Sequence, residues 1–224
     1  MDIKTFNWVV TGANGNVGMA LINELVQRQY YIFGIDYGKG QQLKELNDYY
    51  IYMEADLTEQ KEVFRVVDEM LKRKKLIHVL VNIVGGFAMG NPVEETTRND
   101  WDYMFNLNFQ TALNCCKITL PEMKKNGFGR IINFGSVAAQ EGMAHAGPYA
   151  VSKAAVVALT KTLALEGKKH GITCNAIIPT IIDTPQNRNA MPEADFSTWT
   201  SPRAIAKTII ETVKNDKTGE MIYV

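Results

Sequence analysis

The chain has 224 residues, of which 46% are hydrophobic and 21% are charged. This composition is that of an ordinary globular protein and excludes a disordered or fibrous one. Because 24 basic side chains balance 24 acidic ones, no overall charge attracts nucleic acid or an anionic membrane, and partners have to be inferred from individual sites.

Short apolar runs alternate with helical patterns along the whole chain. The runs predict strands at 6–10, 30–35, 50–53, 76–84, 130–134, 172–178 and 221–224. The spacing of apolar residues between them predicts helices at 17–27, 41–46, 59–71, 99–125, 149–169 and 201–213. Apolar strands that alternate with helices form a parallel sheet covered on both faces. We therefore expect one doubly wound α/β domain over residues 1–224, with a sheet of about seven strands.

Cysteine and histidine positions argue against disulfides and metal sites. Cys115, Cys116 and Cys174 have neither the spacing of a disulfide framework nor that of a metal-binding pair. The three histidines are scattered without ligand spacing, so no metal is predicted. The N-terminus lacks a signal-peptide pattern, and no stretch approaches the ~20 apolar residues that cross a bilayer. A cytoplasmic protein without a membrane partner is expected.

A glycine-rich turn joins the first predicted strand to the first predicted helix. It reads Thr11-Gly12-Ala13-Asn14-Gly15-Asn16-Val17-Gly18, and such glycines let the backbone approach a pyrophosphate at a helix N-terminus. Asp36 ends the second strand, where a carboxylate can accept hydrogen bonds from the ribose hydroxyls of a dinucleotide. The same charge repels the 2′-phosphate of NADP, so NAD(H) is favoured, while the nearby Lys39 keeps NADP(H) open.

Tyr149 and Lys153 are four positions apart in a predicted helix, so both side chains lie on one face. A nearby ammonium favours the phenolate, which suits a proton-transferring group near neutral pH. The spacing alone is weak, because a chain with nine tyrosines produces such pairs by chance.

Two further residues place this pair in a known pattern. Ser136 follows the strand 130–134, and Asn108 falls within the long helix. With them the chain resembles the short-chain dehydrogenase/reductase family over essentially its whole length. The resemblance implies a Rossmann fold in which Tyr149 exchanges a proton and Ser136 hydrogen-bonds the substrate oxygen. It also implies that Lys153 holds the nicotinamide ribose and lowers the tyrosine pKa, and that Asn108 anchors a proton-relay water.

The resemblance extends to the cofactor site. The glycine turn has the spacing of the family's extended branch, whereas the downstream residues match its short branch. The residues that the resemblance assigns to the cofactor are Gly12, Asn14, Gly15, Asn16, Val17, Gly18, Asp36, Tyr37, Asp56, Leu57, Asn82, Gly85, Tyr149, Lys153, Pro179, Ile182 and Thr184.

Residues 180–200 follow the strand that Pro179 ends, at the sheet edge where ligands bind. We call this segment the lid, because it is expected to cover the substrate. Residues 183–188 and 191–200 are similar to the corresponding segment of dihydropteridine reductase, as are residues 85–91. The candidate substrate contacts form an apolar and aromatic set, namely Phe87, Met89, Met143 and Trp199.

The combined features predict an oxidoreductase that transfers a hydride between a nicotinamide cofactor and a small carbonyl or alcohol substrate. Two alternatives stay open. One is dihydropteridine reductase-like reduction of a quinonoid pterin, and the other is a non-catalytic protein that senses the dinucleotide. The sensor is disfavoured because it needs only the dinucleotide site, whereas this chain also has the four residues of the catalytic pattern.

The resemblance also implies a homodimer. In the family, the helices at 99–125 and 149–169 pair across a two-fold axis. The small apolar residues expected at that surface are Ala154, Ala155, Val156, Ala158 and Leu159.

Overall fold

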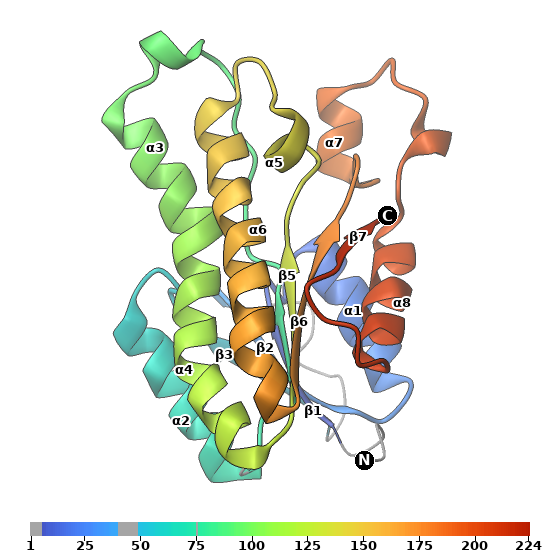
Figure 1. Ribbon diagram of the computed structural model, residues 1–224. Coiled ribbons are helices and arrows are strands. Elements are labelled where there is room, and N and C mark those ends of the chain that lie inside the picture. The colour runs from blue at the N-terminus through green and yellow to red at the C-terminus, as the bar shows by residue number, and fades with distance from the viewer. Residues whose placement is uncertain (1–5, 40–48, 75) are drawn as a thin grey trace.

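Seven parallel strands form one sheet, as a computed structural model that describes residues 6–39, 49–74 and 76–224 shows (Figure 1). The strands are β1 (Asn7–Thr11), β2 (Tyr31–Asp36), β3 (Tyr50–Glu54), β4 (Val79–Asn82), β5 (Gly129–Phe134), β6 (Ile172–Ile178) and β7 (Met221–Tyr223). Their order is β3-β2-β1-β4-β5-β6-β7, and every neighbouring pair is parallel. The predicted doubly wound fold is confirmed.

Helices connect the strands. They are α1 (Asn16–Val26), α2 (Gln60–Lys74), α3 (Arg98–Met104), α4 (Thr111–Asn126), α5 (Ala138–Glu141), α6 (Gly147–Gly167), α7 (Pro185–Ala190) and α8 (Pro202–Val213). Short helical turns add η2 (Val93–Glu95), η3 (Phe105–Gln110), η4 (Lys168–His170) and η5 (Phe196–Thr198). The helix predicted at 41–46 lies outside the described residues.

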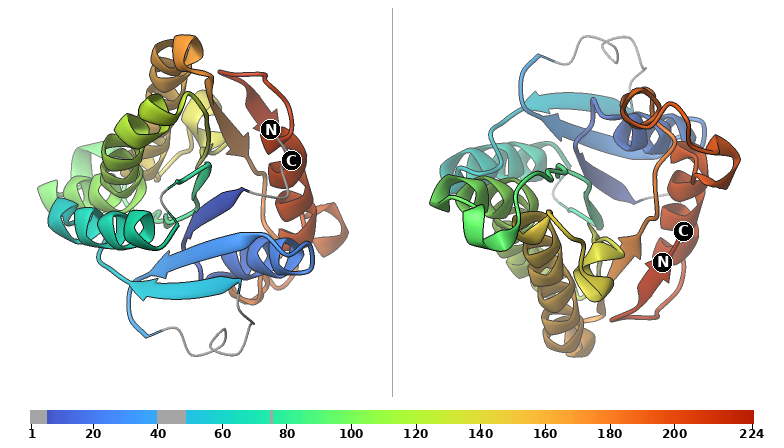
Figure 2. Two further views of the ribbon diagram at one scale, coloured as in Figure 1. Left: turned by 90° about the horizontal axis from the view of Figure 1, so that it is seen from below. Right: turned by 90° about the horizontal axis from the view of Figure 1, so that it is seen from above.

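Each face of the sheet has its own core. Helices α1 and α8 pack on one face, and α2, α4 and α6 pack on the other; Figure 2 shows the two groups on opposite sides of the strands. Along β1, Trp8 and Val10 enter the first core and Val9 enters the second. Coverage of both faces explains why apolar residues occur on both sides of the strands rather than on alternate positions only.

The helix predicted at 99–125 is interrupted by one π-helical turn. Helix α3 passes into η3, where the N–H of Thr111 donates to the carbonyl of Asn106, five residues back, and α4 follows. The Thr111 hydroxyl also donates to the Leu107 carbonyl over 2.8 Å. Asn108 lies inside this widened turn. The apolar spacing at 99–125 predicted one continuous helix and not this turn.

The helices α5 and α7, absent from the prediction, lie in loops that follow the strands. They have 4 and 6 residues, too few to show a hydrophobic period. The local signal for α7 is a cap, since the Thr184 hydroxyl accepts from the N–H of Asn187 over 3.2 Å and Pro185 follows it.

One of the five α6 residues expected at a dimer surface does not lie on the outside of the helix. Val156 is buried in this chain's own interior at 1% exposure, so it is not available to a partner. Ala158 is exposed, and Ala154, Ala155 and Leu159 are half-buried. The large exposed apolar side chains on this helix are Val151 and Leu165.

Cysteines and histidines do not gather into sites. Cys115, Cys116 and Cys174 are buried and free, and burial raises their pKa values. Within residues 6–39, 49–74 and 76–224, no group of three or more His, Cys, Asp or Glu side chains is arranged to hold a metal ion. Over the same residues, no helix combines the length and the apolar character that crossing a membrane requires.

Candidate active site

The glycine turn is tightly folded against α1. Gly12 has a φ of +67°, a left-handed conformation that suits glycine. A Cβ atom on Gly18 would lie 2.1 Å from the carbonyl oxygen of Gly12, so the close approach of turn and helix requires glycine there. Gly15 precedes the helix, and no side chain caps its first turn. Uncapped N–H groups at a helix start suit a pyrophosphate.

Asp36 ties the glycine turn to the end of β2. Its Oδ2 accepts from the backbone N–H of Asn14 and its Oδ1 from that of Tyr37, each over 2.8 Å. Each carboxylate oxygen retains a lone pair for another donor. The Asn14 amide donates to the hydroxyl of Tyr52 over 3.0 Å. Tyr52 is a contributor that the sequence reasoning missed, because its only signal is an aromatic residue in a strand.

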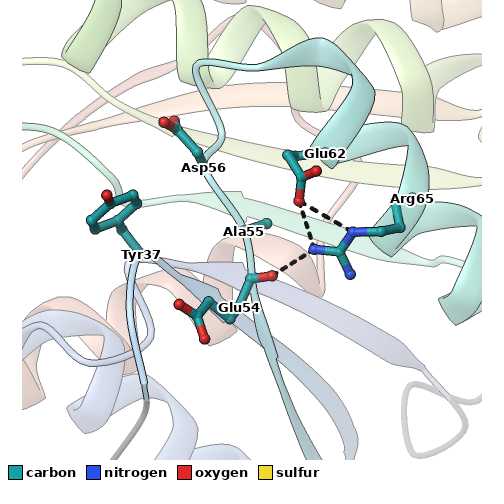
Figure 3. A pocket seen from close by; sticks show the side chains of 6 residues that line it. All are labelled: Tyr37, Glu54, Ala55, Asp56, Glu62 and Arg65. Carbon is teal, nitrogen blue, oxygen red and sulfur yellow. Dashed lines mark hydrogen bonds and ion pairs between the residues drawn. The ribbon is translucent and has the colours of Figure 1, made fainter.

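A hollow of about 450 Å³ opens beyond the ends of β2 and β3 (Figure 3). Its lining consists of Tyr37, Glu54, Ala55, Asp56, Glu62 and Arg65. The two side chains predicted to contact a cofactor, Tyr37 and Asp56, therefore lie at one pocket. Leu57, predicted with them, places its side chain in the core.

The cation of this pocket is held by its neighbours. In Figure 3 the Arg65 guanidinium points to Glu62 and to the backbone of Glu54. It donates to the Glu62 carboxylate and to the Glu54 carbonyl, each over 2.7 Å. A charge that is already paired is less available to a further anion.

Tyr149 and Ser136 meet at the carboxyl end of the sheet. Tyr149 lies early in α6, and Ser136 follows β5. Burial raises the pKa of Tyr149, and the neighbouring Ser136 hydroxyl opposes that rise. The Phe87 ring contacts the Tyr149 ring edge-on, with centroids 4.9 Å apart. The two hydroxyls form a pair of donors beside an aromatic surface.

Lys153 is buried beside them but bonds elsewhere. Its ammonium donates to the carbonyl of Phe134 over 3.0 Å, and burial lowers its pKa to about 8. The ammonium is directed to a backbone carbonyl, and burial is the main influence on the Tyr149 pKa.

Asn108 is 1% exposed and fully hydrogen-bonded through its amide. Its Oδ1 accepts from the N–H of Gly86 over 2.8 Å, and its Nδ2 donates to the Ser152 hydroxyl over 3.0 Å. A Cβ on Gly85 would lie 2.8 Å from that Oδ1 and 3.0 Å from the Lys153 Nζ. Gly85, Asn108 and Lys153 are thus brought together.

Asn82 is placed inside the sheet rather than at its edge. It is 3% exposed, and its Nδ2 donates to the Asn133 Oδ1 over 2.8 Å. Its own Oδ1 is buried without a hydrogen-bond partner among the described residues. The side chain joins β4 to β5, so any contact with a cofactor would have to come from the neighbouring loop. Thr11 holds that loop by accepting from the N–H groups of Ile83 and Val84.

Three of the four candidate substrate contacts lie on two adjoining loops. Phe87, Met89 and Met143 are 55%, 59% and 45% exposed. The loops that carry them are joined by a hydrogen bond from the N–H of Gly90 to the carbonyl of His145 over 2.8 Å. Phe87 contacts Tyr149, and exposed apolar side chains on these loops offer a surface to an apolar substrate.

Trp199 has different neighbours. Its ring packs on Phe196 at 4.8 Å between centroids, and the Arg188 guanidinium covers the same Phe196 ring at 4.8 Å. Arg188 also pairs with Asp183 over 2.5 Å. These side chains form a cluster within the lid, so Trp199 is anchored there by its own segment.

The lid begins and ends at one place. Ile182 pairs with Thr200 in a parallel bridge, and the N–H of Asp183 donates to the Thr200 carbonyl over 2.9 Å. Pro179 directly follows β6, and Thr184 caps α7. The predicted cofactor residues of this segment thus lie at its attachment to the sheet.

Comparisons with known proteins identify the family of the chain. A family model described as short chain dehydrogenase matches residues 7–195. The chain is 30% identical over 179 residues to L-fucose dehydrogenase from Oryctolagus cuniculus, which covers 79% of this chain and 63% of that enzyme. It is 29% identical over 198 residues to 3beta-hydroxysteroid dehydrogenase from Mediterraneibacter gnavus, covering 85% of this chain and 70% of that enzyme.

A solved structure, ElxO with NADP bound, has the same fold. It aligns with a TM-score of 0.87 and 24% sequence identity, over 98% of this chain and 97% of that one.

Proposed function

The chain belongs to the short-chain dehydrogenase family and is therefore an oxidoreductase that uses a nicotinamide cofactor, and from this premise we propose that it reduces a small apolar carbonyl compound with NADH. One observation carries the proposal. The Ser136 hydroxyl neighbours the Tyr149 phenol, and the Tyr149 ring contacts the exposed side chain of Phe87.

The proposed roles follow from the donors and their surroundings. The nicotinamide supplies a hydride when bound. Tyr149 donates the proton to the substrate oxygen, and Ser136 donates a hydrogen bond to the same atom. Hydride and proton together convert the carbonyl to an alcohol. Lys153 holds the cofactor ribose, and its charge favours the tyrosinate that remains after proton transfer.

The residues present fit such a cofactor. Close packing at Gly18 brings the turn against the helix start, and the hollow beyond the ends of β2 and β3 supports an adenosine site lined by Tyr37 and Asp56. We propose further that the lid, residues 180–200, covers the bound substrate and that residues 1–224 act as one domain.

The direct test is NADH consumption with a panel of apolar ketones, aldehydes and quinones. The proposal expects turnover of at least one of them. A dinucleotide sensor would bind NADH, which a change in cofactor fluorescence would reveal. It would not oxidise NADH with any compound of the panel.

We propose that NADH is preferred over NADPH. Asp36 accepts two backbone hydrogen bonds at the site of the ribose, and Arg65 is already paired with Glu62. Asp36→Ala should reduce the ratio of kcat/KM for NADH to that for NADPH by about 10-fold, because it removes both a repulsive charge and an acceptor.

Glu54→Ala is the matched control for that change. Glu54 is the register partner of Asp36 on β3 and is exposed, so its loss removes a neighbouring charge without touching the glycine turn. A smaller effect than that of Asp36→Ala is expected. A wild-type preference for NADPH would contradict the assignment and would point to Lys39.

We also propose that the chain forms a homodimer through α4 and α6, which lie side by side on one face of the molecule (Figure 1). Ala158 is exposed there between the apolar side chains Val151 and Leu165. Light scattering at micromolar concentration should give twice the mass of the chain. Ala158→Arg should give a monomer, whereas Ala204→Arg on α8 should not. A monomeric wild type would contradict the proposal.

A further inference from the structure

Hydrogen bonds link the loop after β4 to the start of α6 through Ser152. The Asn108 amide accepts from Gly86 and donates to the Ser152 hydroxyl. The Ser152 hydroxyl in turn donates to the backbone carbonyl of Tyr149 over 2.8 Å. Ser152 is 0% exposed. An unpaired polar group in such a place is costly, so all three bonds are strongly favoured.

The polarity of these bonds fixes the Asn108 side chain. Because the Ser152 hydroxyl gives its proton to the Tyr149 carbonyl, only its lone pairs face the amide. Rotation of the amide would place two acceptors together at Ser152 and two donors together at Gly86. The amide is therefore held with Nδ2 towards α6 and Oδ1 towards the loop.

This orientation matters because of what borders the amide. A Cβ on Gly85 would touch both the Asn108 Oδ1 and the Lys153 Nζ, so the amide and the ammonium enclose the same piece of backbone. Asn108 also lies in the π-helical turn η3, where the helix is widened. A change in the amide position would move the loop that carries Gly85 and Phe87 relative to Tyr149.

We propose that Ser152 is a positioning residue for proton transfer at Tyr149. It acts through Asn108, by holding the amide between α6 and the loop after β4, and it touches neither substrate nor cofactor. The inference rests on the proposed function, in which Tyr149 donates the proton.

Ser152→Ala tests the proposal. It should lower kcat by about 10-fold, the scale of a small misplacement of reacting groups. The KM for NADH should stay within about twofold of the wild-type value, because the glycine turn and Asp36 are untouched. The pH at which kcat declines on the alkaline side should also shift, since the neighbours of Lys153 change. Ser152→Thr keeps the hydroxyl and should restore most of kcat.

Thr160→Val is the matched control. Thr160 lies further along α6, is 0% exposed, accepts from the Asn133 Nδ2 over 2.9 Å and donates to the Val156 carbonyl over 2.8 Å. Like the Ser152 hydroxyl, its hydroxyl therefore accepts from an asparagine amide and donates to a backbone carbonyl of α6, but at a distance from Tyr149. We expect Thr160→Val to lower the Tm as Ser152→Ala does, but to leave kcat and its pH profile unchanged.

A double-mutant cycle with Asn108→Ala shows whether Ser152 acts through the amide. Adding Ser152→Ala to Asn108→Ala should lower kcat no further. The proposal would be overturned if the kcat losses of Ser152→Ala and Asn108→Ala multiplied in the double variant. It would also be overturned by a wild-type kcat in Ser152→Ala, or by an equal kcat loss in Thr160→Val. If Ser152→Ala fails to fold, Ser152→Cys keeps the shape with a weak hydrogen-bonding group and takes its place. Tyr149→Phe distinguishes failure of this inference from failure of the proposed function, since full activity of that variant would overturn the proposed function itself.

Discussion

Tyr149→Phe is expected to lower kcat for NADH-dependent carbonyl reduction by at least about 100-fold, the scale of general acid catalysis. The substitution removes only the proton donor. The ring that contacts Phe87 remains, and the glycine turn and Asp36 are unchanged, so NADH affinity should change little. Steady-state kinetics together with NADH fluorescence titration measure both quantities.

Tyr103→Phe provides the control. Tyr103 is 61% exposed on α3, outside the pair formed by Tyr149 and Ser136, so the same loss of a hydroxyl should leave kcat unaltered. Turnover of Tyr149→Phe near that of the wild type would falsify the assignment of the proton donor.

The pH dependence of this step has a definite sign. Burial lowers the pKa of Lys153 to about 8, so its positive charge is present below that pH and is lost above it. Reductive kcat should therefore fall as the pH rises through about 8 at saturating NADH. Lys153→Met should have a low kcat without that decline. A wild-type kcat constant up to pH 10 would show that the lysine charge does not assist the step.

Ser136→Ala should lower kcat by on the order of 100-fold if the substrate is a ketone, equivalent to about 3 kcal/mol. Negative charge develops on a ketone oxygen as hydride adds, and a second hydrogen-bond donor stabilises it in the transition state. The Ser136 hydroxyl neighbours that of Tyr149, so both donors can reach a common acceptor.

The same variant separates carbonyl reduction from pterin reduction. A quinonoid pterin is planar and would rest on apolar side chains such as Phe87, and its reduction has no need for this serine. A small loss in Ser136→Ala, together with efficient turnover of quinonoid dihydropteridine and none of any ketone, would favour the pterin enzyme. Ser197→Ala, which removes a lid hydroxyl bonded only to Asp195 among the described contacts, is the control.

Much of the fold and part of the site could be predicted from local sequence. Each strand of a sheet covered on both faces is a continuous apolar run, so the strand positions were recognisable without any knowledge of the neighbours. The glycine turn depends on backbone conformation at Gly12 and on close approach at Gly18, which are properties of adjacent residues. Asp36 then follows from its place at the end of the second strand.

Other features depend on residues that are distant in sequence. The Asn108 amide meets the Ser152 hydroxyl across 44 positions, and neither residue carries a local signal of that bond. Lys153 donates to a carbonyl at the end of β5 rather than to its helix neighbour Tyr149. Trp199 packs on Phe196 inside the lid instead of beside Phe87.

The difference between the features that local sequence predicts and those that it does not has a physical cause. Apolar period and turn conformation are set by interactions over a few residues, and these are written directly in the sequence. The direction of a buried hydrogen bond, the burial of Val156 and the widened turn at Asn108 are decided when packed elements compete for the same space and the same donors. The sequence by itself therefore determined the sheet and the residues of the candidate site, and the tertiary structure decided how their side chains are held.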